Sequence, residues 1–309
     1  MSGTTIAPDG RTADRTPTVW RSWHLHLGST AASLHDRVVT EVIGPTVDDL
    51  PGRPWFFIRY WQAGPHLRLR IGDLTEAEAR GTEQALTARL AGAGRLRAGE
   101  EPVDAPSYLL SARRLAATGD GAPETGVEEL LPPGVHRAVY VPETERYGGP
   151  ALMPGAERLF QLSSELVRTH LPALPGPRER SAMALRATVS AGAALGPAAE
   201  QAAYYRHALD AWRGMVAAGF GYSAEQLDRL TGAGRPAPAG AGIDPGRHGP
   251  FAEWHRLLRE LAQAVGETGS THPGRIVFSH VHMVHNRLGL TLVDELQTYA
   301  RLVRLFPEE

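Results

Sequence analysis

The stretch FFIRYWQAGPHLRLRI, residues 56–71, has the pattern of two β-strands joined by a short connection. Both flanks are rich in aromatic and branched residues, and the linker at residues 62–65 carries the glycine and proline typical of turns. In the second flank the leucines face one side, while His66, Arg68 and Arg70 face the other. The stretch therefore predicts a β-hairpin with an arginine-rich face.

The register of this hairpin decides what the arginines can do. A four-residue linker pairs Trp61 with His66 and places Arg59 directly opposite Arg68 on the same face. Like charges in directly opposite positions destabilise a sheet, so an arginine-rich face indicates a bound anion. A solvent-exposed strand face explains the same residues without a ligand, and the hairpin alone leaves both interpretations open.

Composition excludes several classes of function. The chain has 309 residues and a net charge of -2, so it lacks the general basic character of a nucleic-acid-binding protein. It contains no cysteine, and all its cationic residues are arginine. Disulfides, thiolate metal sites, a cysteine nucleophile, a phosphate-loop lysine and a Schiff-base lysine are therefore excluded. There is no apolar run of membrane-spanning length and no hydrophobic signal region at the start, so we expect a cytoplasmic protein without membrane contact.

The order of segments predicts an α+β fold. We expect a disordered tail over residues 1–17 and a single domain over residues 18–309. An N-terminal antiparallel sheet containing the hairpin should pack with a largely helical C-terminal half. Strands are predicted at residues 20–28, 55–71 and 135–141. Helices are predicted at residues 34–42 (ended by Gly44-Pro45), 74–90 (started by Thr75), 153–171, 181–194, 197–215, 251–265 and 282–306 (with a break at Gly289). Residues 274–280 fit either a short strand or the start of a helix, and residues 231–250 form a loop rich in glycine and proline.

Two further motifs carry residues suited to chemistry. The stretch VPETERYGG, residues 141–149, places Glu143 and Arg146 in a turn after a predicted strand, where a surface ion pair explains them equally well. The stretch SHVHMVHNRLG, residues 279–289, offers a histidine for general acid–base work near neutral pH. A core histidine and an Asn286 that caps a helix form the alternative interpretation of that second motif.

The histidines of the second motif do not have the spacing of a metal site. On a helix His282 and His285 share a face while His280 lies elsewhere, and on a strand His280 and His282 share a face without His285. The sequence places no pair of carboxylates nearby to complete a ligand set. We therefore expect no metal at this motif.

The combination of FFIRYW…GPHLRLRI, PETERYGG and HMVHNRLG, in this order, resembles the C-terminal domain of lantibiotic dehydratases. The resemblance extends from Trp20 to Leu305 and includes free-standing proteins of thiopeptide biosynthesis. It implies an enzyme that eliminates glutamate from glutamylated Ser or Thr of a precursor peptide, forming dehydroalanine or dehydrobutyrine. It also implies no cofactor, a ribosomally made precursor with a leader as substrate, and a separate glutamylation enzyme that uses the tRNA. The oligomeric state stays open, with a homodimer compatible with the sequence.

The resemblance also assigns residues. The family's elimination residues match Arg68 and Arg70, Glu143 and Arg146, and His282, so His282, Arg70 and Arg146 are expected to be catalytic. Arginines suit the carboxylates of a glutamyl group, and His282 is the candidate for proton transfer. The remaining residues expected to contact substrate are Arg68, Glu143, Arg59, Tyr147, Asn286 and Arg287.

Two other functions remain compatible with the same resemblance. A related branch of the family joins two dehydroalanines by a formal cycloaddition, forms a pyridine and releases the leader peptide, with His282, Tyr147 or Tyr299 as proton shuttles. A non-catalytic subunit that binds the precursor peptide is the third possibility, and it predicts a degraded set of arginine and histidine residues. The set in this chain is intact, which favours elimination.

Overall fold

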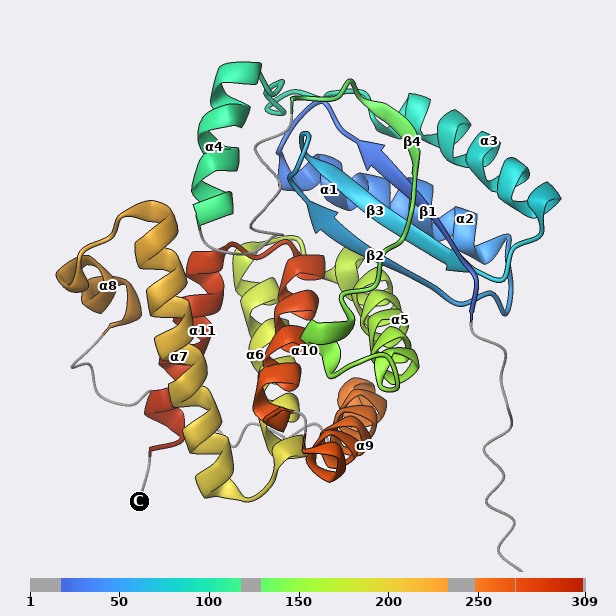
Figure 1. Ribbon diagram of the computed structural model, residues 1–309. Coiled ribbons are helices and arrows are strands. Elements are labelled where there is room, and N and C mark those ends of the chain that lie inside the picture. The colour runs from blue at the N-terminus through green and yellow to red at the C-terminus, as the bar shows by residue number, and fades with distance from the viewer. Residues whose placement is uncertain (1–17, 118–128, 233–247, 270, 308–309) are drawn as a thin grey trace, which may run out of the picture.

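The computed structural model describes residues 18–117, 129–232, 248–269 and 271–307. The predicted N-terminal tail, residues 1–17, lies outside the described residues, as does most of the loop predicted at residues 231–250. Within the described part, a small sheet from the first half of the chain lies beside a group of long helices from the second half (Figure 1). This arrangement confirms the predicted α+β class.

The sheet has four antiparallel strands in the order β2-β3-β1-β4. The strands are β1 (Trp20–His26), β2 (Trp55–Tyr60), β3 (His66–Gly72) and β4 (Gly134–Ala138). Alternation gives the sheet two different faces. Trp23, Leu25, Leu67 and Leu69 are buried on one face, whereas the other face carries His24 and His26 of β1 and His66, Arg68 and Arg70 of β3.

The register of the β2–β3 hairpin differs from the prediction by one residue. Tyr60 pairs with His66 and Ile58 with Arg68, so residues 61–65 form a five-residue loop and Trp61 pairs with nothing in the ladder. A one-residue shift turns every side chain of a strand to the opposite face. Arg59 therefore lies across from Leu67 on the other face from Arg68, and the predicted pairing of two like charges was wrong.

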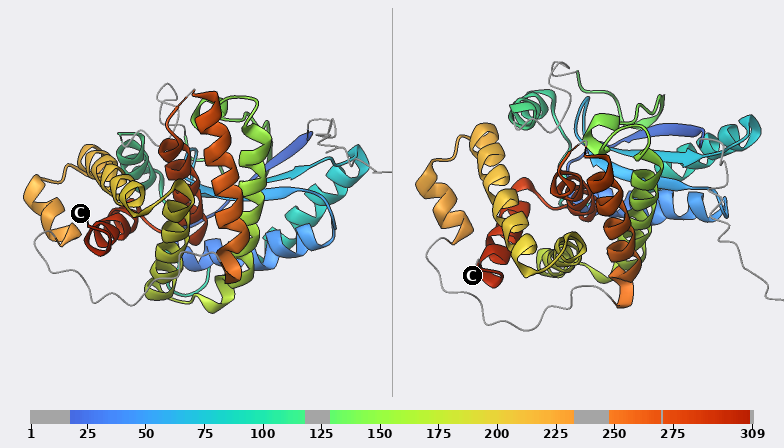
Figure 2. Two further views of the ribbon diagram at one scale, coloured as in Figure 1. Left: turned by 90° about the horizontal axis from the view of Figure 1, so that it is seen from below. Right: turned by 60° about the horizontal axis from the view of Figure 1, so that its bottom comes forward.

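Helices cover the apolar face of the sheet, as the views of Figures 1 and 2 show. They are α1 (Ala32–Val38), the π-helical segment η1 (Val39–Ile43), α2 (Gly44–Asp48) and α3 (Glu76–Ala93). The expected end at Gly44-Pro45 was wrong, because helical backbone continues from α1 through the π-helical segment η1 into α2, which contains Pro45. The expected start of α3 is confirmed, since Thr75 and Glu78 form a capping box.

The second half of the chain is helical. Its elements are η2 (Thr144–Tyr147), α5 (Met153–His170), η3 (Leu171–Ala173), α6 (Pro177–Leu195), α7 (Ala198–Phe220), α8 (Ala224–Thr231), η4 (Gly249–Phe251), α9 (Ala252–Thr268), α10 (Pro273–Leu288) and α11 (Leu292–Leu305). Residues 274–280 belong to α10, and the break expected at Gly289 is confirmed by the left-handed C-cap at that residue. The sequence did not predict α8 or α4 (Ala105–Ala117).

Helices α5 and α10 close the outer edge of β2. The hydroxyl of Ser164 on α5 accepts a hydrogen bond from the Phe57 N–H at 3.2 Å. The Asn286 amide on α10 accepts from the Arg59 N–H at 2.8 Å and donates to the Arg59 carbonyl at 2.9 Å. An edge strand otherwise presents unpaired backbone groups, and here side chains satisfy them, which fixes α10 against the sheet.

Candidate functional site

A small pocket lies where the polar face of the sheet meets α5, α10 and the segment after β4. Its walls combine arginines, aromatic rings and one carboxylate, and they enclose a cavity of about 70 Å³. The lining residues are Phe56, Ile58, Arg68, Arg70, Tyr140, Val141, Glu143, Tyr147, Met153, Phe160, Met283 and Arg287. Five of the residues predicted to act in the site (Arg68, Arg70, Glu143, Tyr147 and Arg287) therefore meet in one place.

Two of the arginines are buried without an acidic partner among the described residues. Arg70 is 7% exposed and Arg287 is fully buried. The Nε atom of Arg70 and the Nη2 atom of Arg287 have no hydrogen-bond partner there. Burial, with the neighbouring charge of Arg68, lowers the pKa of Arg70 to about 10, and burial lowers that of Arg287 to about 9. A buried guanidinium with unused donors is costly, so these arginines offer the pocket donors suited to an anion.

Arg68 approaches the same pocket from β3. Its Nε donates to the Nε2 atom of His66 at 3.1 Å, and its guanidinium lies 3.5 Å from the centre of the Tyr60 ring. Arg70 lies over aromatic rings in a similar way, 4.8 Å from the centre of Tyr140. Stacking on rings holds both guanidinium groups in place.

The motif that follows β4 turns back over the pocket. The short 3-10 helix η2 ends at Gly148, whose φ of 88° is left-handed, and a Cβ there would come within 2.7 Å of Ile276. This turn buries the Tyr147 ring against Phe160, with ring centres 4.8 Å apart. Arg146 does not line the pocket, but its Nη1 donates to Glu143 at 3.1 Å and positions that carboxylate.

Arg59 belongs to a different group of charges on the opposite face of the hairpin. Its Nη2 lies 2.7 Å from the Asp36 carboxylate, and its Nε donates to the main-chain carbonyl of Arg287 at 3.0 Å. Arg180 also pairs with Asp36 and donates to the Leu288 carbonyl. We call Asp36, Arg59 and Arg180 the Asp36 cluster; it holds the C-terminal end of α10 rather than lining the pocket.

The predicted catalytic histidine also lies apart from the pocket. His282 is buried on the face of α10 that packs on α11, where its Nδ1 is 2.9 Å from Glu295. His285 contacts the same carboxylate, at 3.2 Å. His280 lies on another face of α10, its ring 5.0 Å from that of Tyr147, as the spacing indicated. Asn286, predicted to contact substrate, holds β2 instead.

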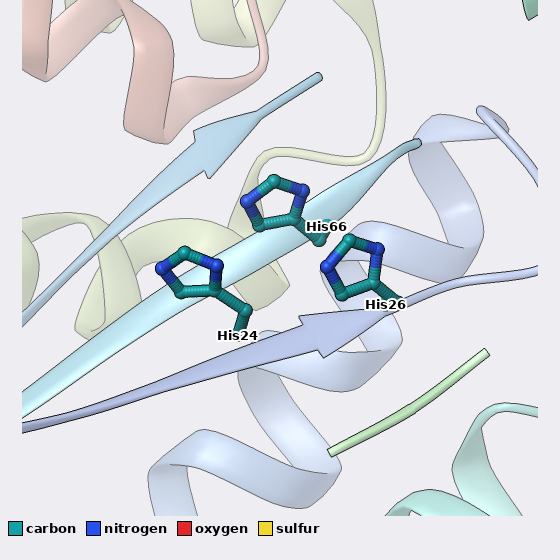
Figure 3. Close-up of side chains that lie close together, drawn as sticks. All are labelled: His24, His26 and His66. Carbon is teal, nitrogen blue, oxygen red and sulfur yellow. The ribbon is translucent and has the colours of Figure 1, made fainter. Parts of the chain in front are cut away.

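Sequence reasoning missed several residues of this region. Tyr140 follows β4 and lines the pocket, and burial raises its pKa as well as that of Glu157 on α5, which lies beside it. Three histidines, His24, His26 and His66, lie next to Arg68 on the polar face of the sheet (Figure 3). The alternation of WRSWHLH in β1 was the available signal for two of them, because it places both histidines on one face.

Comparison with known proteins identifies the fold. The model of the family described as lantibiotic biosynthesis dehydratase C-term matches residues 20–306. A search of curated proteins found no match. Among the described helices, none is both long and apolar enough to cross a membrane.

Several solved structures share the fold, among them TbtD, TsrL and MibB. The pyridine synthase TbtD from thiomuracin biosynthesis is 20% identical with a TM-score of 0.63, covering 91% of this chain and 97% of its own. TsrL is 16% identical with a TM-score of 0.61, covering 95% of each chain. The tRNA-dependent lantibiotic dehydratase MibB from Microbispora sp. 107891 is 20% identical with a TM-score of 0.56; the similarity covers 97% of this chain and 28% of MibB.

Proposed function

The chain belongs to the lantibiotic biosynthesis dehydratase C-terminal family, and we propose that it eliminates glutamate from glutamylated Ser or Thr side chains of a ribosomally made precursor peptide. The products are dehydroalanine or dehydrobutyrine and free glutamate. In this reaction a base removes the α-proton of the modified residue, the Cβ–O bond breaks, and glutamate leaves with the bonding electrons as a carboxylate. A separate glutamylation enzyme supplies the substrate, and the peptide's leader serves for recognition.

The observation that carries this proposal is the convergence of Arg68, Arg70 and Arg287 on one small pocket. Negative charge develops on the leaving carboxylate as the Cβ–O bond breaks, and fixed donors in a buried site stabilise such charge strongly. The unused donors of Arg70 and Arg287 are available for this carboxylate. The small cavity suits a carboxylate and the atoms next to it.

Proton removal needs a base at the same place. Glu143 is the carboxylate that lines the pocket in the described part of the chain, and the adjacent Arg146 holds its side chain. We assign α-proton removal to Glu143, with an alternative role in binding the glutamyl ammonium group. His282, the catalytic candidate from the sequence, contacts Glu295 and does not line the pocket. Its contribution to the reaction would be to hold α10 in place.

The test is direct. A precursor peptide with glutamylated Ser or Thr, incubated with the protein, should lose the glutamyl mass together with the side-chain oxygen, as followed by mass spectrometry. Glu143→Gln should abolish this loss while the protein stays folded, and His282→Ala should lower its stability as well as its activity. If Glu143→Gln eliminates glutamate at the wild-type rate, Glu143 is not the base. If the wild-type protein leaves the glutamylated peptide unchanged in mass, the proposed function is wrong.

Pyridine formation is the second candidate, because TbtD matches this chain over almost the full length of both. In that reaction the pocket would hold two dehydroalanines, and the buried Tyr147 would transfer protons during ring formation. A precursor that carries azoles and several dehydroalanines distinguishes the two reactions, since only pyridine formation releases the leader peptide. Release of the leader without loss of glutamate from the first substrate would favour this second function. Binding of both peptides without either reaction would indicate a precursor-binding subunit.

A further inference from the structure

Three histidines gather on the polar face of the sheet, next to the arginine pocket. His24 and His26 are two residues apart on β1, and His66 pairs with His26 across the β1–β3 ladder, so all three point to the same side. The centre of the His66 ring lies 4.3 Å from that of His26 and 4.8 Å from that of His24. Figure 3 shows the three rings side by side above strands β1 and β3.

We propose that His24, His26 and His66 bind a divalent transition metal ion, with Zn²⁺ as the ion to test. One ring nitrogen of each residue lies within 4.8 Å of the other two. Tetrahedral zinc bound at about 2.1 Å to imidazole nitrogens needs these atoms roughly 3.4 Å apart, so side-chain rotations on a rigid sheet complete the site. Imidazole suits zinc, copper, nickel and cobalt ions, and a set of three protein ligands leaves one position for water or substrate.

A hydrogen bond prepares one of the three ligands, and burial fixes a second. The Nδ1–H of His66 donates to the Gly64 carbonyl at 2.8 Å, which leaves Nε2 with a lone pair. A carbonyl that fixes the tautomer in this way is the usual support of a metal-bound histidine. His26 is 2% exposed, so its ring is held in a buried position beside that of His66.

Arg68 stands in competition with the metal ion. Its Nε–H now occupies the lone pair of His66 Nε2, at 3.1 Å. A metal ion on that nitrogen requires Arg68 to move away, and the charges of Arg68 and Arg70 on the same face weaken the binding of any cation. We therefore expect weaker binding than in a closed structural zinc site. The same competition couples the metal ion to an arginine of the pocket.

Calorimetric titration of untagged, metal-free protein with ZnCl₂ tests the site, because a polyhistidine tag would bind zinc itself. We expect one zinc ion per chain and at least a tenfold loss of affinity in each of His24→Ala, His26→Ala and His66→Ala. The matched control is His207→Ala, which removes an exposed histidine of α7 and should change nothing. Absence of saturable binding, or binding that survives all three substitutions, would overturn the proposal.

Two further measurements separate a built site from general effects. Arg68→Ala should bind zinc several-fold more tightly than the wild type, because it removes the competing donor and a nearby positive charge. An unchanged or weaker affinity in Arg68→Ala would contradict the competition. Circular dichroism identifies variants that do not fold. If substitutions at the buried His26 and His66 unfold the protein, His24→Gln still tests zinc binding, because His24 is only partly buried. None of these readouts depends on the elimination reaction.

Discussion

The arginines of the Asp36 cluster and those of the pocket lie on opposite faces of the β2–β3 hairpin. The two groups differ in whether an acidic side chain pairs with them. In the Asp36 cluster, Arg59 and Arg180 share one carboxylate and take the last carbonyls of α10. In the pocket, Arg70 and Arg287 keep donor atoms without a partner in the described part of the chain. A buried arginine with an acid stabilises the fold, whereas a buried arginine without one marks a place for a ligand.

The largest effect that this comparison predicts is on the reaction. Arg70→Met should lower kcat/KM for glutamate elimination about a hundredfold, because it removes a fixed donor to the leaving carboxylate. The free energy of unfolding should stay the same or rise, since an uncompensated buried charge is lost. The measurements are single-turnover mass spectrometry and urea denaturation, with Arg301→Met on the exposed face of α11 as the control. A variant that loses stability in step with activity would place Arg70 among the structural arginines.

The reverse result is expected for the Asp36 cluster. Asp36→Ala leaves two buried guanidinium groups without their acid and should lower the free energy of unfolding by about 3 kcal/mol. Most of the activity should remain at temperatures where the variant is folded, because the pocket arginines are untouched. Urea denaturation and rates at low temperature check this prediction. Unchanged stability would show that the two groups do not differ as proposed.

Each region also contains a buried histidine whose pKa is lowered. Burial, with Arg59 for His35 and Arg287 for His280, lowers both pKa values to about 3. Below a pH of about 6.5 the unfolded chain binds protons that the folded chain does not, so stability is complete above this pH and falls as the pH decreases towards 3. Each histidine should contribute a loss of about 1.4 kcal/mol per pH unit in this window.

Denaturation at a series of pH values checks this dependence, and the single substitutions His35→Gln and His280→Gln should each flatten it. The range from about pH 7.5 to about pH 5.5 spans the histidine pKa of the unfolded chain. A free energy of unfolding that stays constant over this range would contradict the buried neutral state of both rings.

The smallest effect concerns Asn286, which connects the two regions through the edge of β2. Asn286→Ala leaves the N–H and carbonyl of Arg59 without their side-chain partner and should cost about 2 kcal/mol of stability. Asn286→Asp keeps the acceptor for the N–H and should cost less. If Asn286→Ala instead abolishes the reaction without loss of stability, the residue contacts substrate, as the sequence first indicated.

The sequence predicted the elements better than their contacts. The capping box at Thr75 and the break at Gly289 are local signals, and both are confirmed. The hairpin register was wrong because a four-residue and a five-residue loop fit the same turn residues, and only contacts with α1 and α10 decide between them. Spacing along α10 separated His280 from His282, yet it could not tell which face would meet the sheet. The cluster of His24, His26 and His66 depends on pairing between distant strands, which no local pattern specifies.

The five-residue loop at residues 61–65 limits how this protein can change. Loss or gain of one residue there would exchange the two faces of β2 and bring Arg59 to the pocket side, while Ile58 would meet Asp36. Most surface loops tolerate changes in length, but this one keeps two groups of charges apart. Natural variants and designed chimeras of this domain should therefore vary in the composition of the loop and conserve its length.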